Sequence, residues 1–168
     1  MHQALAFGPV PSRRLGRSLG VNNIPAKICT YSCVYCQLGA AVTVTIQRKE
    51  YYSPEAITEA VAERVSAVLA QGENIDYLTI VPDGEPTLDA NLGSTITSLR
   101  SFGIPVAVIS NASLIWQPQV RADLNNADWV SLKVDAVQEN TWRRIDRGHR
   151  SLNLDNILDG MLAFREEF

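Results

Sequence analysis

All the cysteines of this chain are concentrated in one short stretch. Cys29, Cys33 and Cys36 lie within CTYSCVYC at residues 29–36, and the rest of the 168-residue sequence contains no other cysteine. Disulfide frameworks use an even number of cysteines spread along small secreted chains, so this odd, closely spaced set indicates metal binding or redox chemistry instead.

The number of available ligands limits the kind of metal site. A structural zinc site and an electron-transfer iron–sulfur cubane each normally take four protein ligands. This chain offers three cysteines, and its two histidines, His2 and His149, are distant from them in sequence. Three cysteines on a four-iron cubane leave one iron open, where a substrate can bind. The alternative is a zinc loop completed by His149 or by another chain.

Strand-like segments recur along the chain that must position these cysteines. Short β-branched runs, typical of buried parallel strands, lie at 77–81, 105–109 and 129–134, and an earlier strand is expected at 18–24. The segment 42–52 alternates between apolar and polar residues and predicts an edge strand or a hairpin.

Helix-like segments lie between and after these runs. Ser53 and Pro54 are suited to be the N-cap and first-turn residues of a helix whose apolar stripe ends near Gly72. Further apolar stripes lie at 92–102 and 154–162. The alternation of strands and helices predicts an α/β fold with a parallel sheet or barrel.

Polar residues follow three of the predicted strands directly. They are DGEPTL at 83–88, SNASL at 110–114 and KVD at 133–135. Ligand sites in α/β sheets and barrels lie at the carboxyl ends of the strands. We therefore expect these three stretches and the cysteine loop to face the same end of the sheet.

CTYSCVYC matches the CxxxCxxC motif of the radical S-adenosylmethionine (radical SAM) superfamily. The resemblance implies that Cys29, Cys33 and Cys36 hold a 4Fe–4S cluster whose open iron chelates the amino and carboxylate groups of S-adenosylmethionine. Reductive cleavage of this cofactor would give methionine and a 5′-deoxyadenosyl radical, which abstracts hydrogen from a substrate. Tyr35, just before the third cysteine, would lie near the adenine.

The resemblance also assigns the polar stretches to the cofactor. Gly84, Glu85 and Pro86 resemble the GEP motif, whose backbone binds the methionine amino group. Ser110 and Asn111 stand where the family usually has a Thr/Ser-Asn-Gly turn, with Ala112 here in place of glycine. Lys133 and Asp135 stand where contacts to the carboxylate or ribose are common. The alternatives are a plain turn, a helix cap and a structural ion pair, respectively.

A longer stretch, FGPVPSRRLGRSLGVNNIP at residues 7–25, together with SLKVDA, is similar to a subgroup of Fe–S oxidoreductases related to the tRNA wyosine-synthesis enzymes. The superfamily fold is a partial (β/α)6 barrel of TIM-barrel type. The resemblance therefore implies that residues 1–168 are a radical SAM core domain. This domain would supply about the first four β/α units, as the N-terminal part of a longer barrel. An open sheet edge would then be free for self-association.

Charge and hydropathy bear on the partners. The net charge is −3, yet basic residues gather at Arg13, Arg14 and Arg17 and again at Arg143, Arg144, Arg147 and Arg150. We expect phosphate contacts, and hence tRNA, only if these arginines share one face. A flavodoxin- or ferredoxin-like reductant is expected as the electron donor.

With no secretory signal or membrane span, a cytoplasmic location is expected. The rival function is a non-catalytic binding module stabilised by zinc or an Fe–S cluster.

Overall fold

The predicted parallel strands are found in one five-stranded sheet. The computed structural model describes residues 4–168, so His2 lies outside the described residues. Four strands run parallel in the order β2 (Gly16–Val21), β5 (Tyr77–Ile80), β6 (Val106–Ser110) and β7 (Trp129–Leu132). A fifth, β1 (Ala6–Ser12), pairs antiparallel with β2. The α/β class is confirmed.

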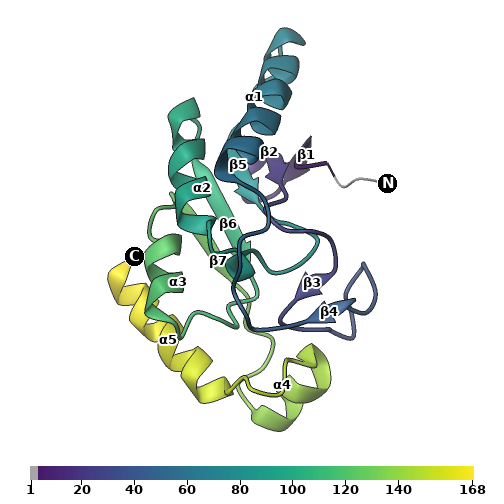
Figure 1. The fold of residues 1–168 in the computed structure, drawn as a ribbon, viewed down its shortest axis with the longest axis vertical. Coiled ribbons are helices and arrows are strands. Elements are labelled where there is room, and N and C mark those ends of the chain that lie inside the picture. The colour runs from purple at the N-terminus through teal and green to yellow at the C-terminus, as the bar shows by residue number, and fades with distance from the viewer. Residues whose placement is uncertain (1–3) are drawn as a thin grey trace.

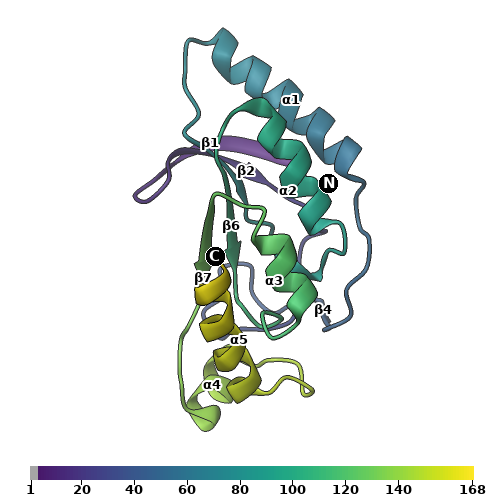
Figure 2. The same cartoon turned by 90° about the vertical axis from the view of Figure 1, so that its left-hand side faces the viewer.

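One face of this sheet is covered by helices (Figures 1 and 2). They are α1 (Pro54–Ala70), α2 (Leu92–Leu99) and α3 (Pro118–Leu124), and α5 (Leu154–Glu167) lies beside α3. The buried core lies between sheet and helices and includes the fully buried Leu19, Leu78, Ile80, Val106, Val108, Ile57, Val61, Leu92 and Ile96. Their burial is the main driving force for this layer arrangement.

The predicted helix boundaries agree with the structure. Ser53 is the N-cap of α1, where its Oγ accepts a hydrogen bond from the Ala56 amide at 3.2 Å, and Pro54 opens the helix. After α2, a short 3-10 helix η2 (Arg100–Phe102) ends at Gly103, which adopts the left-handed conformation at φ 68°. Side-chain capping and C-terminal glycine are the local signals that made these boundaries predictable.

The sequence did not predict β1, α3 or α4 (Glu139–Asp146). β1 contains Pro9 and Pro11, which argue against a central strand, but an edge strand tolerates proline. Its partner β2 accommodates it through Gly20, because a Cβ there would lie only 2.2 Å from the Phe7 ring. α4 has few apolar residues, so its sequence lacks the broad stripe that predicts a helix.

The segment 42–52 is not the edge strand or hairpin that its alternation predicted. Only β4 (Thr43–Val44) forms, and it pairs in parallel with β3 (Ile28–Cys29) in a separate two-stranded sheet. Val42 is 78% exposed, whereas Ile46, Tyr51 and Tyr52 pack partly buried against the core, so the alternation does not mark the buried face of one strand. β3, β4 and the cysteine loop lie at the same end of the molecule as α4 (Figure 1).

Arg48 fixes the rest of this segment to the end of the sheet. Its guanidinium donates to the carbonyls of Thr87 and Asp89, both at 2.8 Å, and pairs with Asp123 of α3. Thr87 belongs to the 3-10 helix η1 (Pro86–Leu88), which follows β5. Arg48 and Asp123 are both largely buried, so each charge depends on the other.

No helix within residues 4–168 is long and apolar enough to cross a membrane. In the described chain β7 pairs only with β6, so one edge of the sheet carries no further strand. Self-association through this edge stays a prediction.

We expect Arg48→Met to destabilise the metal-free chain by roughly 3–5 kcal/mol, because it leaves the buried Asp123 carboxylate without its cation. Arg100→Met is the matched control, since the Arg100–Asp128 pair is exposed and its loss should cost under about 1 kcal/mol. Urea unfolding followed by circular dichroism measures both. Equal losses in the two variants would contradict the anchoring role of Arg48.

Candidate active site

The three cysteine thiols line one cavity. Its volume is about 190 Å³, and its wall also includes Tyr31, Gly84 and, from the cysteine loop, Ser32, Leu38 and Gly39. Cys29 is the last residue of β3, and the loop then turns so that the Cys36 amide donates to the Cys33 carbonyl at 3.1 Å. The described residues contain no group of three His, Cys, Asp or Glu side chains that could hold a single metal ion. The three cysteines thus share the wall of one cavity.

This arrangement fits a cubane better than a zinc ion. A tetrahedral zinc site requires its sulfur ligands at about 2.3 Å from one point. In a cubane each iron takes its own cysteine, so the thiolates stand around the cluster. His149 does not line this cavity, so it does not complete a zinc site with the three cysteines.

A second cavity, of about 480 Å³, contains all three thiols and the ends of three strands. Val81, Pro82, Gly84 and Glu85 line it after β5, Ile109 to Asn111 at the end of β6, and Ser131 to Lys133 at the end of β7. Of the residues predicted for the cofactor, Tyr35, Gly84, Glu85, Ser110, Asn111 and Lys133 line this cavity. The predicted convergence of strand ends and cysteine loop is therefore present.

Pro86 and Asp135, also predicted for the cofactor, do not line this cavity. Pro86 is buried at the start of η1, where its carbonyl accepts from Asn23 Nδ2 at 3.1 Å. Asp135 lies just beyond the Lys133 ammonium and pairs with it. Neither side chain forms the wall, so their assigned cofactor contacts stay predictions.

The Glu85 side chain has a structural role, because it connects the ends of two strands. Its carboxylate is 1% exposed and accepts hydrogen bonds from Ser110 Oγ and the Asn111 amide, both at 2.7 Å, and from the amide and hydroxyl of Thr87. Burial raises the pKa of Glu85, and these hydrogen bonds oppose that shift. The carboxylate thus joins the end of β5 to the end of β6. Only the backbone of this stretch is left to face an ammonium group.

Gly84 allows the backbone just before the cysteine loop to approach the end of β5 closely. A Cβ at Gly84 would stand 2.1 Å from the Ile28 carbonyl, and the same carbonyl accepts from the Glu85 amide at 3.2 Å. Only glycine allows so close an approach of two backbones. Ile28 directly precedes Cys29, so Gly84 sets the position of the first thiol relative to the sheet.

The turn after β6 reaches the cysteine loop through Thr30. Asn111 Nδ2 and Ser113 Oγ both donate to the buried Thr30 hydroxyl, at 2.8 and 2.6 Å, and Asn111 Nδ2 lies 3.5 Å from Cys29 Sγ. Ala112, in place of the family's glycine, keeps a left-handed conformation at φ 64°. The turn is therefore formed despite this replacement, at the steric cost that a Cβ imposes there.

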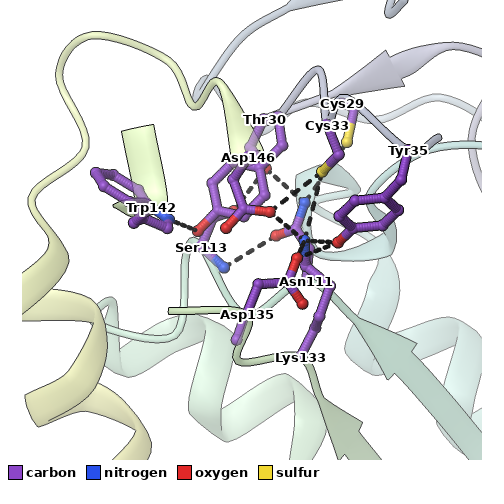
Figure 3. A network of polar contacts seen from close by, with 12 residues as sticks. Cys29, Thr30, Cys33, Tyr35, Asn111, Ser113, Lys133, Asp135, Trp142 and Asp146 are labelled. Carbon is purple, nitrogen blue, oxygen red and sulfur yellow. Dashed lines mark hydrogen bonds and ion pairs between the residues drawn. The ribbon is translucent and has the colours of Figure 1, made fainter. Parts of the chain in front are cut away.

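Lys133 lies at the centre of a polar network (Figure 3). Its Nζ contacts Asp146 Oδ1 at 2.5 Å, Tyr35 Oη at 2.8 Å, Asp135 Oδ2 at 2.9 Å and Cys33 Sγ at 3.4 Å. Burial disfavours its charge, but the hydrogen bonds to Asp146, Tyr35 and Asp135 outweigh burial and raise the pKa of Lys133. The ammonium therefore stays charged beside the second cysteine.

The last turns of α4 and the residues that follow it hold the cysteine loop, an arrangement that the sequence did not predict. The amides of Ser32 and Val34 donate to the carbonyls of Asp146 and Ile145 at 3.0 and 2.9 Å, and the His149 amide donates to Thr30 at 2.9 Å. The buried Trp142 also donates from Nε1 to the Tyr31 hydroxyl at 3.1 Å. The signal was Asp146, an acid within the basic run RRIDRGHR.

The predicted basic groups have different surroundings. Arg17 pairs with Glu73, and Arg143 pairs with Glu139 and donates to the carbonyls of His149 and Leu152. Arg14 lines the larger cavity together with the cysteines. The remaining basic residues, Arg13, Arg144, Arg147 and Arg150, are exposed. Arg17 and Arg143 thus have structural partners of their own.

Comparison with known proteins identifies the sequence pattern. The sequence model of the Radical SAM superfamily matches residues 23–168. A UPF0026 protein of Methanocaldococcus jannaschii is 57% identical over 98% of this chain and 50% of its own length. A UPF0026 protein of Helicobacter pylori is 36% identical over 96% of this chain and 52% of its own length. The chain thus spans about half the length of these curated relatives.

Solved structures show the same fold. An archaeal TYW1 structure gives a TM-score of 0.57 at 18% identity, covering 89% of this chain and 52% of that one. Streptococcus suis SuiB bound to S-adenosylmethionine gives 0.57 at 16% identity, covering 85% of this chain and 30% of that one. Identities this low support a common architecture.

We expect Glu85→Gln to destabilise the metal-free chain by about 1–3 kcal/mol, because an amide cannot accept all four hydrogen bonds and buried donors lose their partner. Glu59→Gln, on the exposed side of α1, is the control and should change stability by less than about 0.5 kcal/mol. Urea unfolding provides the comparison. If Glu85→Gln were as stable as Glu59→Gln, the carboxylate would not join the two strand ends.

Proposed function

Because the chain belongs to the radical SAM superfamily, we propose that it binds a 4Fe–4S cluster through Cys29, Cys33 and Cys36. We further propose that it uses this cluster to cleave S-adenosylmethionine for hydrogen abstraction from a substrate. When bound, the cluster supplies the electron that cleaves the cofactor to methionine and a 5′-deoxyadenosyl radical. The activity, substrate and partners of the whole protein are part of this proposal, since the chain spans about half of its relatives.

One observation carries the proposal: the same three thiols line both cavities of the site. The smaller cavity lies within the cysteine loop, and the larger one opens onto three strand ends. A metal centre held by these thiols would face the strand ends directly. An open coordination position there is what a reactive metal site requires and a structural one lacks.

The residues of the larger cavity have separate tasks in this proposal. The backbone at Gly84 and Glu85 accepts the ammonium group of the cofactor in this proposal, because the Glu85 side chain is already bonded to Ser110, Thr87 and Asn111. The apolar side chains of Val81, Ile109 and Leu132 form part of the wall. Such a surface limits the access of water to a reactive intermediate.

The rival function, a binding module stabilised by zinc or a cluster, is less well supported. It requires a closed site with four ligands, and the described residues provide no group for a single ion. It also leaves the larger cavity, which the three cysteines share with the ends of β5, β6 and β7, without a ligand. In the proposed function S-adenosylmethionine would occupy this cavity.

Electron paramagnetic resonance (EPR) tests the function under anaerobic conditions. After reconstitution with iron and sulfide and reduction, we expect a cubane spectrum that changes when S-adenosylmethionine is added, because the cofactor binds the open iron. Cys33→Ala should lose this spectrum, whereas Ser32→Ala, which keeps every thiol in the same loop, should retain it. Uptake of one zinc ion, or a cluster spectrum indifferent to the cofactor, would overturn the proposal.

The partners are further proposals. We propose that a flavodoxin- or ferredoxin-like protein supplies the electron. We also propose tRNA as the substrate class to test first, since Arg14 lines the larger cavity together with the three cysteines and four other arginines are exposed. Phosphate contacts weaken as salt rises.

Filter retention of tRNA at increasing salt tests the nucleic-acid proposal. Arg14→Gln should weaken binding and reduce the salt slope by roughly one phosphate contact. Arg17→Gln is the control, because Arg17 already pairs with Glu73. The absence of any tRNA retention at low ionic strength would exclude this substrate class.

A further inference from the structure

We propose that Lys133 serves the metal-binding cysteine rather than the carboxylate or ribose of the cofactor. In this view it is a positioning residue. Its ammonium donates to the Cys33 sulfur, Asp146 holds it there, and the positive charge of Lys133 makes the bound cluster easier to reduce. The inference rests on the proposed function and adds to it a residue that sets the electron affinity of the cluster.

The Lys133 ammonium has no N–H donor to spare for the cofactor. A lysine ammonium has three N–H groups. Nζ of Lys133 already has four acceptors within reach, namely Asp146, Tyr35, Asp135 and Cys33 Sγ. Two of these acceptors are carboxylates, which form the stronger bonds. No donor is left for a carboxylate or hydroxyl of the cofactor.

Two aromatic rings lie close to the Lys133 ammonium and limit its position. The Lys133 ammonium lies 5.0 Å from the centre of the Tyr31 ring and 5.4 Å from that of the Tyr35 ring. Both rings attract a cation on their faces. Trp142 fixes the Tyr31 ring in turn through its indole N–H. The ammonium thus contacts two aromatic residues of the cysteine loop itself.

Asp146 is a buried carboxylate that needs the Lys133 cation. Its side chain is 1% exposed and lies in the last turn of α4, where the helix dipole disfavours a negative charge. A buried carboxylate in that position requires a cation, and Lys133 provides it at 2.5 Å. Because the Asp146 carbonyl also accepts from Ser32, the same residue fixes both the loop and the ammonium beside it.

Metal binding turns the Cys33 thiol from a hydrogen-bond donor into an acceptor. Without metal, Cys33 Sγ donates to Asp146 Oδ1 at 3.3 Å. A metal-bound cysteine is a thiolate, which only accepts. Its negative charge would then stand beside the Asp146 carboxylate, and the Lys133 ammonium is the cation between them. Hydrogen bonds and positive charge at cluster sulfurs raise the reduction potential.

An EPR-monitored redox titration of the reconstituted chain, without S-adenosylmethionine, tests this inference. Lys133→Met should shift the cluster potential to more negative values by about 59 mV, a tenfold change in the one-electron equilibrium. Lys133→Arg keeps the charge and N–H donors and should restore most of the potential. Lys49→Met is the control and should have no effect, since the Lys49 ammonium lies over the Tyr51 ring.

The affinity for S-adenosylmethionine separates the two roles of Lys133. We expect the dissociation constant of the cofactor to be the same in wild type and Lys133→Met. An unchanged potential in Lys133→Met would overturn the inference, and weakened cofactor binding with it would assign Lys133 to the cofactor instead. A wild-type chain whose cluster ignores the cofactor would overturn the proposed function itself, which is a different result.

A second variant covers loss of the cluster. If Lys133→Met takes up no iron, Lys133→Gln, which keeps a neutral N–H donor, is titrated in its place. A more negative potential in Lys133→Gln supports the inference, because the positive charge is gone. A potential equal to that of the wild type overturns it.

Discussion

Backbone hydrogen bonds from two distant segments hold the cysteine loop, and the geometry of the whole site depends on them. The loop has only a two-residue strand of its own. On one side the Ile28 carbonyl accepts from Glu85 after β5, and on the other the amides of Ser32 and Val34 donate to the end of α4. A loop with so few internal bonds would otherwise be mobile. The sheet and α4 together determine where the thiols stand.

Buried charge strengthens this arrangement because each acid near the loop has a defined set of donors. Glu85 takes its donors from the turns after two strands, and Asp146 takes its cation from the end of a third. A buried carboxylate that loses a donor costs much more than a surface one. The strand ends are thereby locked in register with one another. The acids at this end of the sheet are structural elements as much as candidate ligands.

The sequence predicted the parallel strands and the long helices because their signals are local. Ser53 and Pro54 open α1, and apolar β-branched runs mark β5 to β7. It also predicted which strand ends would meet, since parallel strands end on one side. The roles within the site were harder to predict. Glu85, a candidate contact for an ammonium group, has its carboxylate bonded to Ser110 and Thr87, and no local pattern shows which way a side chain turns.

The role of Asp146 could not be predicted for a related reason. It lies 113 residues from Cys33 along the chain, and its neighbours Arg144 and Arg147 make the segment look like a basic surface. Only the packing of α4 against the loop reveals its role, through Trp142 on Tyr31 and the carbonyls of Ile145 and Asp146 on the loop amides. Because Lys133, directly after β7, and Asp146, in the last turn of α4, both reach Cys33, β7 and α4 act on the cysteine loop. A cluster held there would respond to changes in the fourth parallel strand as directly as to changes in its own loop.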